Sequence, residues 1–451
     1  MNWKMINPHD LKIKQAIRNM VASLLAAVFL LVGCQGQSIL DTIFPQAESQ
    51  LGGAHSTPGP VITPQVDNMP NVQPPNYVEL ELWVPPQFDP NGEGEAAKLL
   101  DERIREFLIQ NPQIELNVRV KALSGPGSMM DSMLGASSVA QAALPSLALL
   151  SRSDLVIAAE RTLIFPIEEF SSSVDENDWY AFAQSMAIYQ GSAYGLPFAS
   201  NVLGLLHRPG ALSGEQPSWD EIFKRRDSLL FPAGDADAMV TLAQYFSAGG
   251  ALDVQMGKME INQEALSAAL NVYERARRAG VIGRDVLENQ TDDQAWEKFQ
   301  TGNADVVITW IARLFTADED LGLAMLPPLG ENPFTFATGW SWCLTEQDIE
   351  TRKYAAALAE FLSAPEFLSQ WAPVSGYLPV RPSSLVSFAE EGLQSTLSTM
   401  LMSAHLRPDR QLIMDVSPQI KIAVDEVING MQTAEESAQN MITRLKESEN
   451  Q

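Results

Sequence analysis

The chain has 451 residues, of which 45% are hydrophobic, and this is enough to build two domains of ordinary size. Its formal net charge of −26 excludes a surface made for nucleic acid or an anionic membrane, because phosphate groups would be repelled. The two cysteines are Cys34 and Cys343. If the first is consumed by processing, no intramolecular disulfide can form.

Residues 1–33 are typical of an export signal. Basic residues precede an uncharged apolar run, Met20 to Val32, which is too short for a comfortable membrane span. The run continues into Leu-Val-Gly-Cys at residues 31–34, which resembles the lipobox of bacterial lipoproteins. We therefore expect an extracytoplasmic protein anchored to the cell membrane by a lipid on Cys34. The alternative is an ordinary signal peptide followed by an incidental cysteine.

Residues 34–76 are predicted to form a lipidated cysteine followed by a disordered tether. Between Gln35 and Asn76 there are seven prolines, no Lys or Arg, and Phe44 as the single aromatic residue. Such a composition cannot bury enough apolar surface to offset the entropy of ordering. Proline would keep the segment extended between the anchor and a folded body.

Alternating strands and helices begin after this tether. Hydrophobic alternation predicts a strand over 78–84, and similar patterns predict strands over 114–120 and 147–150. Helical spacing predicts helices over 97–108 and 129–143 between them. This βαβαβ order indicates an α/β fold with parallel strands.

The middle of the chain is rich in predicted helices. Leu266, Ala269, Leu270 and Tyr273 mark one helix, with Asn262 placed to cap its start and Gly280 to end it. A short helix around residues 296–299 precedes a strand over 306–308. Two more helices, around 358–362 and 367–371, are separated by Ser363 and Pro365.

Motifs for catalysis or metal binding are missing from the sequence. The four histidines have no second ligand type at metal spacing, and neither a nucleophile elbow nor a Walker loop occurs. The pair Asp292 and Asp293 could serve as acid and base, but adjacent acids usually decorate the start of a helix. We therefore expect no enzyme, no metal and no cofactor.

Aromatic and polar residues gather at the ends of predicted strands, where open α/β sheets bind their ligands. The faces of aromatic side chains stack on the apolar faces of sugar rings, and polar side chains form directional hydrogen bonds with the hydroxyl groups. For any single tryptophan, the competing interpretation is a place in the core. Arg152 would favour hydroxyls or an anionic group, unless it pairs with Asp154. The expected ligand-binding residues are Gln87, Arg152, Asn201, Trp310, Trp340 and Trp342.

Several segments, taken in order over roughly residues 77 to 445, resemble the sugar-binding type of extracellular solute-binding proteins, relatives of maltose-binding protein. They are Tyr-Gly-Leu-Pro at 194–197, Pro-Ser-Trp-Asp-Glu at 217–221, residues 296–310, Pro-Pro-Leu-Gly at 327–330, Gly-Trp-Ser-Trp-Cys-Leu at 339–344 and Gly-Tyr-Leu-Pro-Val-Arg at 376–381. The resemblance implies a two-lobe periplasmic-binding-protein-like fold with a hinge and an interlobe ligand cleft.

Transferred to this sequence, the resemblance places lobe one at 77–200 plus 305–345 and lobe two at 207–303 plus 346–445. The crossings would lie near 201–207 and 304–309. It implies a monomer that captures a small polar ligand, a mono- or oligosaccharide, and delivers it to the permease subunits of an ABC importer. The family also accommodates glycerol phosphates, polyamines and iron. A surface-anchored glycosidase and a sensor or scaffold lipoprotein are the alternatives.

Overall fold

The computed structural model describes residues 77–139, 143–214, 216–225, 228–255, 258–386, 388 and 391–448, all within one compact unit, Gln73–Gln451. The expected signal peptide, Cys34 and tether lie outside the described residues. Within the described ranges, no helix has both the length and the apolar character that crossing a membrane requires.

The predicted βαβαβ order at the start of the folded body is confirmed. Strand β1 (Val78–Val84) lies parallel between β2 (Ile114–Val120) and β3 (Leu147–Ser151). Helix α2 (Glu95–Gln110) connects β1 to β2, and α3 (Met129–Val139) lies between β2 and β3. Helical spacing gives α2 one buried face, with Leu100, Ile104 and Phe107 toward the core.

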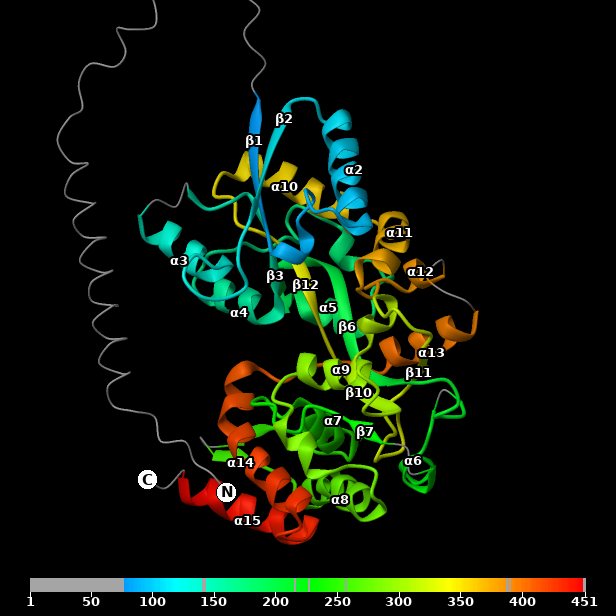
Figure 1. Ribbon diagram of the computed structural model, residues 1–451. Coiled ribbons are helices and arrows are strands. Elements are labelled where there is room, and N and C mark those ends of the chain that lie inside the picture. Colours follow the sequence, from blue (N-terminus) through cyan, green and yellow to red (C-terminus); the bar gives the residue numbers. More distant parts are fainter. Residues whose placement is uncertain are drawn as a thin grey trace, which may run out of the picture. The chain divides into compact units, whose positions relative to one another are not determined.

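Two long antiparallel strands, β6 (Gly195–His207) and β12 (Thr335–Leu344), run side by side through the middle of the sheet (Figure 1). The strand order is β2-β1-β3-β12-β6-β10-β7, with β10 spanning Val306–Trp310 and β7 spanning Leu229–Leu230. The first half of β6 pairs with β12. Its second half pairs with β10 and with β11 (Gly322–Ala324), so β6 carries the chain from one half of the sheet to the other.

Helices cover each half of the sheet. In the half that holds β10, α14 (Arg410–Asn429) and α15 (Ala434–Ser448) pack against α8 (Gln263–Ala279) (Figure 1). The predicted caps of α8 are confirmed, because the side chain of Asn262 accepts from the backbone N–H of Ala265 and Gly280 takes a positive φ. The other helices of eight or more residues are α4 (Arg152–Glu160), α7 (Met239–Ser247), α9 (Asp292–Gln300), α10 (Ile349–Leu362), α11 (Pro365–Ser375) and α13 (Glu391–Met402).

Shorter elements complete the order along the chain. They are η1 (Pro86–Phe88), η3 (Ser173–Asp175), α5 (Ala181–Ala187), β4 (Ile188–Tyr189), β5 (Ser192–Ala193), α6 (Trp219–Arg225), β8 (Asp253–Gln255), β9 (Lys258–Glu260), η4 (Arg284–Glu288), η5 (Ile311–Phe315), α12 (Pro382–Leu385) and β13 (Ala404–Leu406).

The packing of these elements differs from the expected lobe boundaries. Strand β10, expected at a crossing into lobe one, lies inside the other half of the sheet between β6 and β7. Helices α10 and α11, expected in lobe two, pack on α2: the Arg103 side chain donates to the carbonyl of Phe361 at 3.0 Å, and Trp371 Nε1 donates to the carbonyl of Ala96 at 3.1 Å. The reason is β12, which returns the chain to the first half of the sheet before these helices begin.

Candidate ligand-binding site

A cavity of about 460 Å³ opens where the ends of several strands meet. Its walls come from η1, β3, β6, β12 and the turn after α11, together with α9, β10 and η5. The described residues that line it are Gln87, Ser151, Asn201, Asp292, Trp310, Ala312, Arg313, Thr316, Thr338, Gly339, Trp340, Ser375, Gly376 and Tyr377. Four of the six expected ligand-binding residues, Gln87, Asn201, Trp310 and Trp340, are therefore brought together here.

One wall of the cavity is aromatic. The Tyr377 hydroxyl accepts hydrogen bonds from the side chains of Gln87 and Trp340. Burial raises the pKa of that hydroxyl, and the two donors oppose the rise. Behind the wall, the ring of Phe88 stacks on Tyr377 with 5.0 Å between centroids and meets Trp340 edge to face at 5.4 Å. These contacts fix the orientation of both aromatic side chains.

Asn201 joins the two halves of the sheet at the edge of the cavity. Its Oδ1 accepts from the backbone N–H of Ala312 at 3.1 Å and of Val202 at 3.0 Å. Asn201 lies on β6 and Ala312 lies on η5, directly after β10. Because the oxygen is occupied by these donors, the amide nitrogen is the group that Asn201 can offer to a ligand.

The opposite wall carries a charged pair that sequence reasoning did not assign to a ligand site. Arg313 donates to Asp292 from Nε at 2.8 Å and from Nη2 at 2.6 Å, and Thr309 Oγ1 donates to the other carboxylate oxygen at 2.8 Å. Burial raises the pKa of Asp292, although Arg313 and Thr309 oppose the rise. The pair is 21 residues apart in the chain, so the sequence offered only the acidic start of α9 as a signal.

Arg152 and Trp342 do not line the cavity. The Arg152 guanidinium donates to the backbone carbonyls of Ile188 at 2.6 Å and Met186 at 3.3 Å, so it binds the end of α5 and the start of β4. Trp342 is fully buried, with its ring 4.9 Å from that of Phe198. The pairing of β6 with β12 has a β-bulge, in which Phe198 is the residue of β6 without a partner on β12. The Phe198 ring covers that of Trp342.

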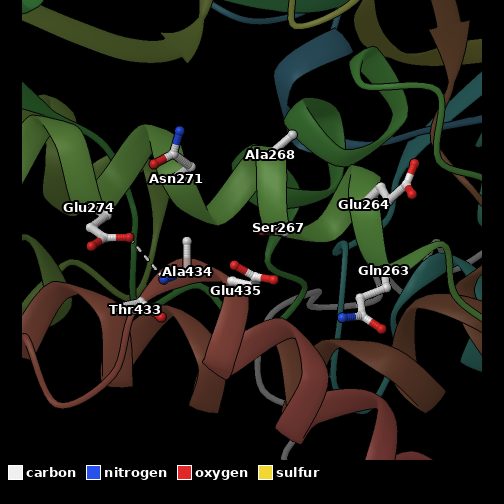
Figure 2. A pocket seen from close by; sticks show the side chains of 9 residues that line it. All are labelled: Gln263, Glu264, Ser267, Ala268, Asn271, Glu274, Thr433, Ala434 and Glu435. Carbon is white, nitrogen blue, oxygen red and sulfur yellow. Dashed lines mark hydrogen bonds between the residues drawn. The ribbon is translucent and has the colours of Figure 1, made fainter.

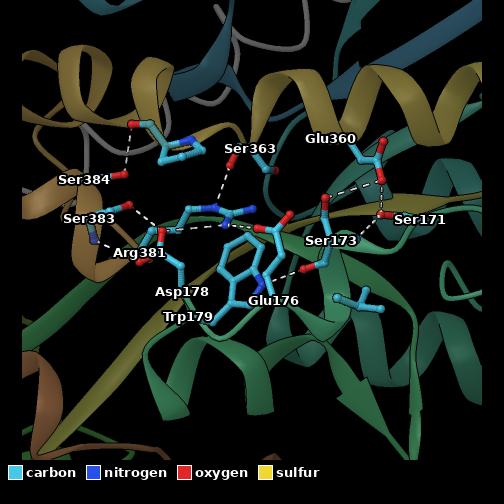
Figure 3. A network of polar contacts seen from close by, with 12 residues as sticks. Ser171, Ser173, Glu176, Asp178, Trp179, Glu360, Ser363, Arg381, Ser383 and Ser384 are labelled. Atoms are coloured by element: carbon cyan, nitrogen blue, oxygen red, sulfur yellow. Dashed lines mark hydrogen bonds and ion pairs between the residues drawn. The ribbon is translucent and has the colours of Figure 1, made fainter.

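An ionic network around the buried Arg381 side chain holds the segment that carries Tyr377. The Arg381 guanidinium lies 3.6 Å above the ring of Trp179 and donates to Glu176 at 2.5 Å and to the carbonyl of Ser363 at 2.9 Å (Figure 3). The Arg381 side chain is only 3% exposed. Backbone hydrogen bonds between Ser200 and Leu378, at 2.8 and 3.0 Å, fasten the same segment to β6. The segment that follows Tyr377 is therefore held at two points, Leu378 and Arg381.

A second cavity, of about 560 Å³, lies between α8 and the start of α15 (Figure 2). Its described lining includes three glutamates, Glu264, Glu274 and Glu435, and no aromatic side chain. Glu274 already pairs with Arg278 and accepts from the backbone N–H of Ala434 at 2.9 Å. The aromatic cavity at the strand ends is accordingly the candidate ligand-binding site.

The chain is similar to several known proteins. It matches the model of a family described as bacterial extracellular solute-binding protein over residues 106–392. Among curated proteins it is similar to the sn-glycerol-3-phosphate-binding periplasmic protein UgpB of Escherichia coli (strain K12), with 25% identity over 175 residues. That match covers 35% of this chain and 40% of UgpB, so the chain spans less than half the length of the curated relatives that it matches.

Solved structures share the fold over most of their length. The sugar-binding protein MalE from Xanthomonas citri has a TM-score of 0.64 and 18% identity, covering 83% of this chain and 98% of that protein. Maltose-bound MalE3 of T. maritima has a TM-score of 0.62 and 19% identity, covering 82% and 99%. Both support the expected two-lobe α/β fold. Because the family model covers more than half of the 451 residues, the chain belongs to the bacterial extracellular solute-binding protein family.

Proposed function

We propose that this protein is a solute-binding lipoprotein that captures a small polar ligand, a mono- or oligosaccharide, and delivers it to an ABC importer. The observation that carries the proposal is the cavity, where Trp310, Trp340 and Tyr377 offer aromatic faces beside polar groups from Gln87 and Asn201. A sugar presents apolar ring faces and directional hydroxyls, which this combination can bind together. The similar structures include complexes with maltose and with maltotetraose, which supports the same ligand class.

We assign the lobes from the packing of the elements. Lobe one would comprise residues 77–200 and 338–385, and lobe two residues 203–334 and 410–448. The crossings would be the short stretch of β6 at 201–202, the first residues of β12, and the segment 388–406. A few φ/ψ changes at the two extended crossings, on β6 and β12, would let the lobes close over a ligand.

The anchor and the transport partner belong to the same proposal. Residues 1–33 would be removed as a signal peptide, and Cys34 would carry the lipid. Residues 35–76 would tether the monomeric folded body to the cell membrane, within reach of the permease subunits.

A thermal-shift screen of sugars, sugar phosphates and polyamines tests the proposed ligand class. A ligand that binds only the folded state raises the midpoint of unfolding, so we expect one or more sugars to raise it. A rise with polyamines alone would contradict the sugar proposal. No rise with any compound would contradict capture of a small polar solute.

A further inference from the structure

The charged wall of the cavity bears on the class of ligand. A phosphate group is normally held by free guanidinium donors or by the N-terminus of a helix. The cavity contains one feature of each kind: Arg313 lies in its wall, and α9 begins there at Asp292. Whether a phosphorylated ligand can bind here depends on the groups that Arg313 and the N-terminus of α9 already contact.

Two of the three nitrogens of the Arg313 guanidinium donate to carboxylates. Its Nε and Nη2 donate to Asp292, and Nη2 also donates to Asp293 at 2.5 Å. Within the described lining of the cavity, the Asp292 carboxylate balances the charge of the Arg313 guanidinium, and the exposed Asp293 side chain lies outside that lining. The remaining described lining residues carry no formal charge. A phosphate at this wall would therefore meet a carboxylate before it met an uncompensated cation.

The N-terminus of α9 also already has carboxylates beside it. The first two residues of the helix are Asp292 and Asp293, and the side chain of the preceding Thr291 accepts from the backbone N–H of Gln294. Carboxylates in the first turn already interact with the positive end of the helix dipole, which would otherwise favour an anion. Both anion-binding features are thus neutralised by the protein itself.

We infer that Asp292 and Arg313 form a specificity-determining pair that admits an uncharged, hydroxyl-bearing solute and rejects its phosphorylated counterpart. This inference rests on the proposed function. Held by Arg313 and Thr309, the Asp292 carboxylate is oriented to accept a hydrogen bond from a hydroxyl, whereas a phosphate placed beside it has no proton to donate when fully ionised. Rejection of the phosphorylated solute arises from like-charge repulsion rather than from the size of the cavity.

Isothermal titration calorimetry with matched pairs of probes tests the inference. Suitable pairs are methyl α-D-glucopyranoside with α-D-glucose 1-phosphate, trehalose with trehalose 6-phosphate, and glycerol with sn-glycerol 3-phosphate. For the wild-type protein we expect the neutral member of each binding pair to bind at least about tenfold more tightly, because opposed like charges are costly at a partly desolvated site.

Two variants with the same net charge identify the residue responsible. Asp292→Asn should reduce or reverse the preference for the neutral probe over the phosphorylated one. The substitution removes the carboxylate that binds Arg313 and that faces the N-terminus of α9, so both become available to a phosphate. Asp293→Asn is the matched control, because the Asp293 side chain is 87% exposed and keeps the contact between Asp292 and Arg313 intact. We expect it to leave the preference for the neutral probe within about twofold of the wild type, because the Asp293 carboxylate lies outside the described lining of the cavity and an exposed charge is screened by water and salt.

The outcomes separate the inference from the proposed function. Tighter binding of the phosphorylated members by the wild type would overturn the inference and leave solute capture supported. Equal changes in Asp292→Asn and Asp293→Asn would also overturn it. Failure of every probe to bind would contradict both. If Asp292→Asn does not fold by circular dichroism, the wild-type comparison alone still decides whether phosphorylated probes are rejected.

Discussion

Trp340 and Trp342 stand two residues apart on the same strand, β12, yet Trp340 lines the cavity while Trp342 is fully buried against Phe198. Side chains two apart on a strand share a face. The difference lies in what covers that face. The rings of Phe198 and Trp371, 4.5 Å apart, pack at the Trp342 end of this face, whereas Trp340 borders the cavity.

This relationship predicts losses of stability of different size when the two tryptophans are truncated. Trp342→Ala should lower the free energy of unfolding by about 3 to 5 kcal/mol, because it leaves a large cavity in the core. Trp340→Ala should cost clearly less, since that side chain already borders open space. Urea unfolding followed by circular dichroism measures both. Equal losses of stability would mean that Trp340 is a core residue.

Tyr377→Phe should weaken ligand binding by about 1 kcal/mol, because it removes the acceptor that orients the side chains of Gln87 and Trp340. Calorimetric titration with a sugar found by screening measures the effect. Tyr189→Phe provides the control, since the hydroxyl of Tyr189 bonds to Glu160, and neither residue lines the cavity. A loss of affinity of the same size in both variants would remove Tyr377 from the site.

Arg381→Ala should destabilise the fold by about 2 kcal/mol, because it removes a buried guanidinium that donates to Glu176 and to the carbonyl of Ser363 and that covers the ring of Trp179. The comparison is Arg105→Ala, whose exposed pair with Asp101 should be worth less than about 1 kcal/mol. Equilibrium urea unfolding distinguishes the two. If Arg381→Ala is no less stable than Arg105→Ala, the network does not hold this segment.

Cys34→Ser should release the protein from membranes into the soluble envelope or the medium, because the acyl anchor would be lost. Cell fractionation followed by immunoblotting measures the distribution. Cys343→Ser is the control, since that buried thiol lies on β12, far from the expected anchor in sequence. Retention of the Cys34→Ser protein in the membrane fraction would contradict lipidation at this residue.

Much of the fold could be predicted from local sequence patterns. Hydrophobic alternation located β1, and helical spacing together with Asn262 and Gly280 located α8. These features depend on neighbouring residues in the chain. Helices α10 and α11 were expected in lobe two, and the packing on which we base their assignment to lobe one depends on the direction of β12 through the sheet, which the pattern of residues 335–344 does not encode.

The residues of the candidate site, too, could be predicted only in part from the sequence. Gln87, Asn201, Trp310 and Trp340 were identified by their position after predicted strands, and they do line one cavity. Arg152 satisfied the same criterion, but its long side chain reaches two carbonyls at the junction of α5 and β4, more than 30 residues away in the sequence. Contacts of that kind, like those between Asp292 and Arg313, arise only when segments far apart in sequence are brought together.

The central claim is that the cavity between Trp310 and Trp340 binds the solute. Calorimetric titration of the double variant Trp310→Ala/Trp340→Ala with a sugar that stabilises the wild-type protein tests it most directly. Each truncation of a stacking tryptophan should cost about 2 kcal/mol, so we predict a loss of affinity well beyond tenfold with the fold preserved by circular dichroism. An affinity within twofold of the wild type in the folded double variant would show that the solute binds elsewhere.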